Sequence, residues 1–259
     1  MIKSIIKKTF NIVGYEIKFN AIGYEIKRKN LRDMFAIRHG FEEALVQLKA
    51  VGYNPDLIID VGAADGTPPL QNVFPASYFF WIEALKEFEP ALINLQQKLK
   101  GNYEITAVGR NNGSIVLNVH KDLHGSTMLE EADGETSDGT PRQIPVSTLN
   151  KLSATHNWKQ FNRILLKVDV QGFELEVLEG SKEILSNVDV VILEVSFFRF
   201  LKNAPDFYDV VTYMKDIGYV VYDIVGGINR PLDYALGQKD LVFVKENGFF
   251  RQSQGWASK

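Results

Sequence analysis

From Asp56 onward, apolar runs of four to eight residues alternate with segments of helical periodicity. The apolar runs predict strands at Leu57–Val61, Tyr78–Glu83, Glu104–Val108, Ile164–Val170, Val188–Val195, Tyr219–Ile224 and Asp240–Lys245. Helices fit between most of them, at about Pro69–Phe74, Glu87–Leu99, Glu174–Leu185 and Pro205–Ile217. Continuously apolar strands that alternate with helices are typical of a sheet buried on both faces. We therefore expect an α/β fold with a doubly wound sheet.

The regular alternation is interrupted between Val108 and Ile164. Ser114–His120 and Gln143–Val146 have the pattern of additional β segments, and the Gly- and acid-rich stretch Glu130–Thr140 predicts an exposed loop. An insertion at this point lies near the strand ends, where it can shape a substrate pocket.

The first 54 residues follow a different pattern. We interpret residues 1–54 as an N-terminal extension of short helical and β elements and residues 55–259 as the main domain. A helix is expected near Asp33–Val51, because Phe41–Leu48 has helical apolar spacing and Gly52 follows as a C-cap. The five-residue repeat GYEIK, at Gly14 and again at Gly23, is too short for a solenoid.

Composition narrows the class of protein. The 259 residues are 45% hydrophobic and 24% charged, which are globular values, and the net charge is −3. We therefore expect no nucleic-acid partner bound through bulk positive charge. The chain has no Cys and only four His, without HExxH spacing. Disulfides, thiol nucleophiles and Cys-ligated metals are excluded, and a multi-histidine metal site is not expected.

No apolar run reaches the length of about 18 residues that a membrane-spanning helix needs, so no integral membrane segment is expected. The N-terminus lacks the apolar core and cleavage site of a secretory signal, which predicts a cytoplasmic protein. In residues 1–13, isoleucines and Phe10 fall on one helical face and lysines largely elsewhere. This segment is interpreted as a helix packed on the body of the protein, with weak peripheral membrane contact as the alternative.

Carboxylates end four of the predicted strands: Asp60, Glu83, Asp169 and Glu194. A buried ionised carboxylate is costly unless it is paired or hydrogen-bonded. In open α/β sheets the ligand crevice lies outside the carboxyl ends of the strands. The four acids together therefore indicate a functional site, although single ones could instead cap loops or pair with Lys167 or Arg163.

The first strand runs into a glycine-rich turn, from Asp60 to Gly66, in which Gly62 and Gly66 let the backbone pass close to a ligand. It is not the dinucleotide fingerprint, because Ala64 stands where the second glycine is needed. Glu83 ends the second strand, at the spacing of an acid that accepts both hydroxyls of an adenosine ribose. A dinucleotide and S-adenosyl-L-methionine both contain that ribose, and the missing glycine favours the second. The residues predicted to bind the cofactor are Asp60, Gly62, Ala63, Asp65, Gly66, Glu83, Ala84, Ala107 and Val108.

Three segments resemble the FkbM-type S-adenosylmethionine-dependent methyltransferases: Leu57–Gly66 (LIIDVGAADG), Trp81–Glu83 (WIE) and Leu165–Gly180 (LLKVDVQGFELEVLEG). The KVDVQGFE part of the last is the most specific. Gly125–Leu129, Val146–Leu149 and Asp240–Val244 also look like later blocks of that family, so the resemblance covers about Asp56 to Lys245. One departure is Ala64, where the family often has Asn. The resemblance implies a Rossmann-like class I methyltransferase fold and methylation of a hydroxyl, often on a sugar or a natural-product scaffold, so a small-molecule or glycan acceptor is expected.

Residue chemistry is compatible with methyl transfer to a hydroxyl, which depends on positioning and is helped by a base or a metal. The predicted catalytic residues are Asp169, Lys167 and Glu194: Asp169 as base, Lys167 to orient it or contact substrate, and Glu194 beside it. Asp169 and Glu194 could together hold a divalent cation, but without a clear third ligand no metal site is predicted. His120 and His124 are alternative bases that are better explained as exposed loop residues.

Two other functions stay open at this point. An NAD-type oxidoreductase is disfavoured by the absence of glycine at residue 64. A non-catalytic nucleotide-binding module would keep the same fold. The sequence does not identify the acceptor, since acceptor pockets are built from its least regular segments.

Overall fold

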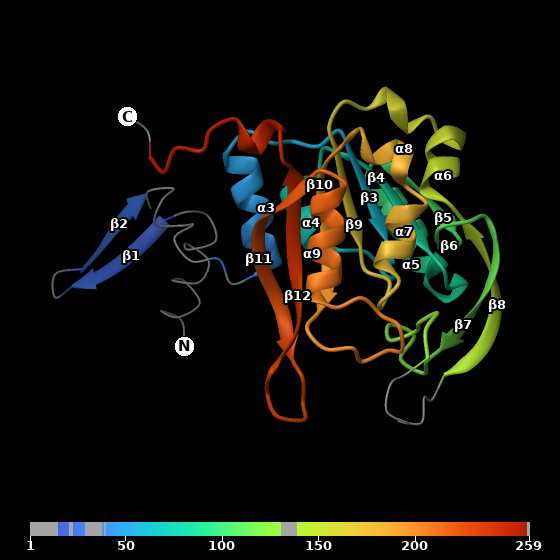
Figure 1. Cartoon of the computed structure of the whole chain (residues 1–259). Coiled ribbons are helices and arrows are strands. Elements are labelled where there is room, and N and C mark those ends of the chain that lie inside the picture. The colour runs from blue at the N-terminus through green and yellow to red at the C-terminus, as the bar shows by residue number, and fades with distance from the viewer. Residues whose placement is uncertain (1–14, 21–22, 29–37, 39, 131–138, 258–259) are drawn as a thin grey trace.

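The computed structural model describes residues 15–20, 23–28, 38, 40–130 and 139–257. Within this part of the chain, the central sheet has seven strands in the order β11-β12-β10-β9-β3-β4-β5 (Figure 1). They are β3 (Leu57–Val61), β4 (Tyr78–Glu83), β5 (Gly101–Ile105), β9 (Ile164–Val168), β10 (Val188–Ser196), β11 (Tyr219–Asn229) and β12 (Leu236–Lys245). Neighbouring strands from β10 to β5 are parallel, whereas β12 is antiparallel to both β10 and β11.

The chain winds outward from the middle of this sheet in two directions. It first runs from β3 through β4 to β5, and it later returns to place β9 and β10 on the other side of β3. The strand order thus reverses between β3 and β9, and a ligand crevice forms outside the carboxyl ends of strands at such a point. The doubly wound α/β sheet predicted from the sequence is confirmed.

Helices cover both faces because the strands are apolar on both sides. Every residue of β3 and of β9 is buried. One face packs against α3 (Phe41–Ala50), α4 (Pro68–Val73) and α5 (Glu89–Lys98), and the other packs against α6 (Leu149–Thr155), α7 (Glu174–Glu179), α8 (Lys182–Leu185) and α9 (Phe207–Asp216). Two hydrophobic cores therefore lie on either side of the sheet, with Trp81 in the first and Trp158 in the second.

Part of the predicted N-terminal extension belongs to the core. The predicted helix near Asp33–Val51 is α3, which begins at Phe41, and Leu45 and Leu48 on it are fully buried against the sheet. Gly52 follows with a φ of +93°, as expected of the residue that ends a helix. The division of the chain after residue 54 stays a prediction.

Tyr15–Lys18 of the first GYEIK copy and Gly23–Lys27 of the second lie on opposing strands of an antiparallel hairpin, β1 (Tyr15–Asn20) and β2 (Gly23–Arg28). The segment 1–13, interpreted from the sequence as an amphipathic helix, lies outside the described residues. None of the helices in the described ranges has the length and apolar character needed to cross a membrane.

The predicted strand Glu104–Val108 is wrong as a single element. It is divided between β5 in the central sheet and β6 (Ala107–Val108), which pairs with β8 (Thr140–Ser147) and β7 (Gly113–Val119) in a small three-stranded sheet. The break falls at Thr106, whose hydroxyl donates to the carbonyl oxygen of Pro145 at 3.2 Å. The chain leaves the central sheet there to pair with the insertion, whose predicted β segments are confirmed as β7 and β8.

The predicted helix Glu174–Leu185 is also divided, into α7 and α8. At Gly180 a Cβ atom would lie 2.1 Å from the carbonyl oxygen of Gly109, so the two backbones touch where the helix breaks. A third difference is α6, which the sequence analysis missed; Thr148 caps it by accepting the N–H of Lys151 at 3.1 Å.

Candidate active site

A pocket of about 260 Å³ opens at the carboxyl ends of β3, β4 and β9. The turn after β3 forms one wall, the end of β4 a second, and the segment after β9 a third. The pocket is lined by eight of the nine residues predicted to bind the cofactor: Gly62, Ala63, Asp65, Gly66, Glu83, Ala84, Ala107 and Val108. The residues predicted from the sequence therefore surround this cavity, and the binding role of each of them stays a prediction.

The turn after β3 packs directly against the segment that follows β9. A Cβ atom on Gly62 would lie 1.8 Å from the carbonyl oxygen of Asp169, and the φ of Gly62 is +73°. Both observations require glycine at this position. Ala64 has a φ of +45°, in the left-handed region where Asn is the better-suited residue. The turn is thus shaped by its backbone, which lies close to Asp169.

Glu83 connects this turn to the end of β4. Its Oε2 accepts the N–H of Ala64 and its Oε1 accepts the N–H of Leu85, both at 2.8 Å. Burial raises the pKa of Glu83, and the backbone hydrogen bonds work in the opposite direction. Each carboxylate oxygen has a second lone pair, so the fixed carboxylate can still accept hydrogen bonds from a ligand.

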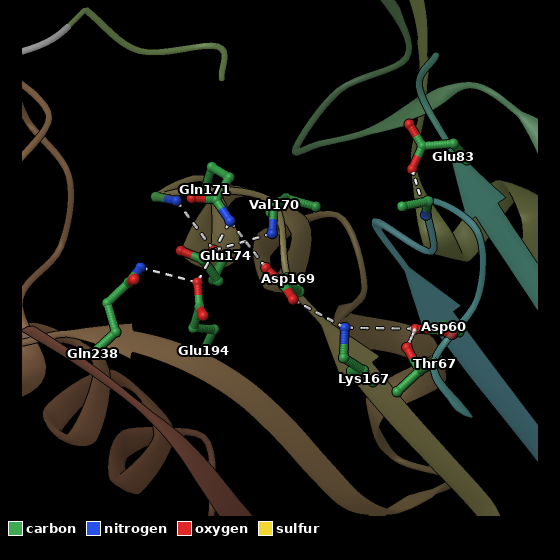
Figure 2. Close-up of polar contacts among 12 residues, drawn as sticks. Asp60, Thr67, Glu83, Lys167, Asp169, Val170, Gln171, Glu174, Glu194 and Gln238 are labelled. Carbon is green, nitrogen blue, oxygen red and sulfur yellow. Dashed lines mark hydrogen bonds and ion pairs between the residues drawn. The ribbon is translucent and has the colours of Figure 1, made fainter. Parts of the chain in front are cut away.

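Lys167 lies between two carboxylates (Figure 2). Its Nζ is 3.1 Å from Asp169 Oδ2 and 3.7 Å from Asp60 Oδ1. Burial alone would lower the pKa of Lys167, but Asp169 and Asp60 outweigh it, so the pKa is raised above its ordinary value. The ammonium group therefore stays protonated, which makes Lys167 unsuited to act as a base.

Asp60 is the one predicted cofactor residue that does not line the pocket. It is 1% exposed, and its Oδ1 accepts a hydrogen bond from Thr67 Oγ1 at 3.2 Å. Among the described residues, its Oδ2 has no hydrogen-bond partner. Burial raises the pKa of Asp60, and Lys167 opposes that shift. Asp60 thus lies beneath the pocket, where it holds Lys167.

Asp169 follows β9, which ends at Val168 rather than at the predicted Val170. Asp169 lines the pocket, but Glu194 does not. Glu194 lies at the end of β10, where its Oε2 accepts N–H groups from Gln238 at 2.9 Å and from Gln171 at 3.5 Å (Figure 2). Burial raises the pKa of Glu194 to about 8, and the negative charges of Asp169 and Asp240 add to this effect.

Glu174 begins α7, as the sequence analysis expected, and its side chain turns back to the preceding loop. Its Oε1 accepts the N–H groups of Val170 at 3.2 Å and Gly172 at 3.1 Å. Glu174 is 4% exposed, and burial raises the pKa of its carboxyl group to about 7. Glu174 therefore fixes the loop that carries Asp169.

Several pocket residues were missed by sequence reasoning. They are Thr67, Leu85, Phe88, Thr106, Leu117, Leu123, Ser126, Met128 and Gln171. Most belong to the insertion or to the segment it packs against, and no local pattern singles them out. His124, an alternative base in the sequence analysis, also lines the pocket, with its ring 5.1 Å from that of Phe88. His120 does not line it.

Asp169 and Glu194, considered from the sequence as possible ligands of a divalent cation, are bridged by the side-chain amide of Gln171. Its Nε2 contacts both carboxyl groups. In the described part of the chain, no group of three or more His, Asp or Glu side chains is arranged to hold a metal ion.

Solved structures similar to this chain include magnesium protoporphyrin IX methyltransferase of Synechocystis PCC 6803 with bound S-adenosylmethionine, at 13% identity and a TM-score of 0.44, covering 94% of this chain and 96% of that one. A second is 1,6-didemethyltoxoflavin-N1-methyltransferase of Burkholderia thailandensis, at 11% identity and a TM-score of 0.43, covering 83% and 81%. A third, from Pyrococcus horikoshii, is described as a candidate RNA methyltransferase, at 14% identity and a TM-score of 0.44, covering 93% and 98%. No match was found among curated protein sequences.

The sequence profile of the methyltransferase FkbM domain matches residues 60–221, which is more than half of the chain. This range contains the turn after β3, Glu83, the insertion and the whole segment from Lys167 to Glu194. Its sheet is a Rossmann-like class I methyltransferase fold. The chain belongs to the FkbM family of S-adenosylmethionine-dependent methyltransferases.

Proposed function

We propose that this protein transfers a methyl group from S-adenosylmethionine to a hydroxyl group of a sugar, or of another small-molecule or glycan acceptor. The observation that supports this most is the meeting of three elements in one pocket: the glycine turn after β3, the fixed carboxylate of Glu83 and the carboxylate of Asp169. The first two suit a cofactor, and the third suits an acceptor hydroxyl.

The cofactor would lie along the first two walls of the pocket. Glu83, already oriented by two backbone N–H groups, would accept hydrogen bonds from the ribose hydroxyls. Ala107, Val108 and Ala84, small apolar residues of the lining, would leave room for the adenine ring. The backbone from Gly62 to Gly66, with Asp65, would surround the amino-acid portion. When bound, S-adenosylmethionine supplies a methyl group already activated on a sulfonium.

The acceptor side of the pocket centres on Asp169. Its carboxylate would accept the proton of the acceptor hydroxyl, since an alcohol is too weakly acidic to react readily without a base. Lys167 would hold Oδ2 of that carboxylate in place while staying protonated itself. The insertion residues Ser126 and Met128 line the pocket and would help to exclude water.

The test is transfer of tritium from [methyl-³H]S-adenosylmethionine to a panel of free sugars, glycan extracts and hydroxylated small molecules, with total RNA as a further arm. We expect label in a hydroxylated small molecule or glycan and none in RNA. Asp169→Asn should lower turnover at least about a hundredfold, the scale for losing a positioned proton acceptor. Its affinity for S-adenosylmethionine should change little. Asp216→Asn, at the exposed end of α9, is the matched control and should keep full turnover.

Near-normal turnover of Asp169→Asn on an identified acceptor would assign the proton transfer elsewhere, and His124 would be the next residue to test. Activity that is lost in EDTA and restored by Mg²⁺ would contradict a plain carboxylate base. Tight cofactor binding without transfer to any arm of the panel would instead support a non-catalytic binding module.

A further inference from the structure

Gln171 occupies an unfavourable backbone conformation that the surrounding structure fixes from both sides. Its φ is +53°, in the left-handed region that costs a side-chain-bearing residue on the order of 1 kcal/mol relative to Gly. The hydroxyl of Thr127, a buried residue of the insertion, donates to the carbonyl oxygen of Gln171 at 2.9 Å. Glu174 accepts the N–H groups of Val170 and Gly172 on either side. The backbone of Gln171 is thus held by two separate segments, the insertion and the start of α7.

That side chain bridges the two carboxyl groups at the ends of β9 and β10. Gln171 Nε2 lies 3.3 Å from Asp169 Oδ1 and 3.5 Å from Glu194 Oε2 (Figure 2). An amide nitrogen carries two N–H donors, so one can serve each carboxyl group. Gln238 donates to the same Oε2 of Glu194 at 2.9 Å. Oε2 of Glu194 accepts N–H groups, so the Gln171 amide presents its nitrogen to this oxygen. The same nitrogen lies beside Asp169 Oδ1.

Asp169 is consequently held through both of its oxygens, Oδ2 by Lys167 and Oδ1 by Gln171. We propose that Gln171 is the positioning residue for the Asp169 carboxylate, and that Glu194 acts through Gln171 rather than on the acceptor. The inference rests on the proposed function for its catalytic meaning. It explains why Glu194, predicted as catalytic, lies outside the pocket lining. It also explains why a costly glutamine, rather than glycine, occupies the turn.

The charges around Glu194 show why the hydrogen bond from the Gln171 amide matters. Asp169, Asp240 and Glu174 face it with negative charge, and Lys167 is the opposing positive group. Without the Gln171 amide, the carboxyl groups of Asp169 and Glu194 would face each other with no donor between them. Loss of a hydrogen bond to the charged form raises the pKa of a carboxyl group. Removal of the Gln171 side chain should therefore raise the pKa of Glu194 and remove a hydrogen bond from the Asp169 carboxylate.

The experiment is a ¹³C NMR titration of the full chain labelled at Asp and Glu carboxyl carbons, with the two signals assigned from Asp169→Asn and Glu194→Gln. Gln171→Gly removes the amide while it favours the left-handed backbone, and thermal unfolding checks that the variant stays folded. We expect it to raise the titration midpoint of Glu194 by about half a pH unit or more and to shift the Asp169 carboxyl signal measured at pH 7. Gln238→Ala is the matched control, because it removes a donor to Glu194 that does not contact Asp169. It should move the Glu194 midpoint and leave the Asp169 carboxyl signal at its wild-type position. An Asp169 carboxyl signal at its wild-type position in folded Gln171→Gly would overturn the proposal.

The titration needs no acceptor, so it gives its answer even if the proposed methyl transfer fails. On any acceptor found in the tritium panel, Gln171→Gly should lower kcat about tenfold or more and leave KM for S-adenosylmethionine unchanged. Glu194→Gln should keep most of the turnover, because its amide oxygen still accepts the N–H of Gln171, whereas Glu194→Ala should lose as much as Gln171→Gly. Equal losses in Glu194→Gln and Glu194→Ala would mean that Glu194 acts directly, and the proposal would be wrong.

Discussion

Replacement of Lys167 by Met tests whether the charges beneath the pocket form one unit. Met keeps much of the volume of the Lys side chain and removes its charge. Asp60, at 1% exposure, would keep only the hydroxyl of Thr67 as a hydrogen-bond partner in the described structure. Removal of one partner from a buried ion pair typically costs about 3–5 kcal/mol, because it leaves an uncompensated buried charge. We expect a loss of that size in the free energy of unfolding at pH 7.

The assay is urea unfolding followed by the fluorescence of the buried Trp81 and Trp158, which report on the two faces of the sheet. Lys182→Met is the matched control, since the Lys182 side chain is 60% exposed and its pair with Glu179 should contribute less than about 1 kcal/mol. Asp60→Asn added to Lys167→Met removes the unpaired charge and should recover most of the lost stability.

The pH dependence of the Lys167→Met variant has a defined sign. Burial already raises the folded-state pKa of Asp60, and the loss of Lys167 removes the group that opposes this shift. An acid with a raised folded-state pKa does not lower the stability at a pH where it is protonated in both the folded and the unfolded state. As the pH rises towards the folded-state pKa, the unfolded state loses its proton first, and the folded state becomes progressively less stable. The stability gap to wild type should therefore narrow towards pH 4. A loss below about 1 kcal/mol at pH 7, or a double variant no more stable than the single one, would refute the reasoning.

Three further predictions concern neighbouring residues. Glu83→Ala should weaken S-adenosylmethionine binding by about 1.5–3 kcal/mol, the range for charge-assisted hydrogen bonds, and unchanged affinity in calorimetry would exclude the ribose contact. Gly62→Ala should abolish cofactor binding, because its Cβ would meet the Asp169 carbonyl oxygen and distort the turn. Most of the helical circular dichroism signal should remain. Normal affinity would show that this turn does not bind the cofactor. Glu174→Gln should be more stable than wild type by up to about 3 kcal/mol at pH 8.5, and as stable as wild type at pH 4. The reason is that the wild-type carboxyl group, whose pKa burial raises to about 7, must ionise inside the protein at the higher pH. A difference in unfolding free energy that is the same at both pH values would contradict this explanation.

The central strands could be predicted because burial on both faces leaves a continuous apolar run in the sequence. The predicted bounds of β3 and β4 agree with the structure. Elements that end at a contact with a distant segment could not be predicted in the same way. The division of β5 from β6 depends on Pro145 in β8, and the break between α7 and α8 depends on the backbone of Gly109.

The same distinction holds for the candidate site. Asp60, Glu83 and Asp169 are visible in the sequence because each interrupts an apolar strand that would otherwise need no charge. Their arrangement is not visible there. Glu194 shows the same sequence signal as Asp169, yet the pocket includes only Asp169.

The doubly wound sheet, the turn after β3 and the acids at the carboxyl ends of the strands can be read from the amino-acid order, because they follow from local periodicity and from the cost of burying charge. The use of these acids depends on the three-dimensional fold. It placed Lys167 between Asp60 and Asp169, and it set Gln171 between Asp169 and Glu194. These contacts join β3, β9 and β10 in three dimensions, and the strand pairing that brings them within hydrogen-bond distance has no local pattern in the chain.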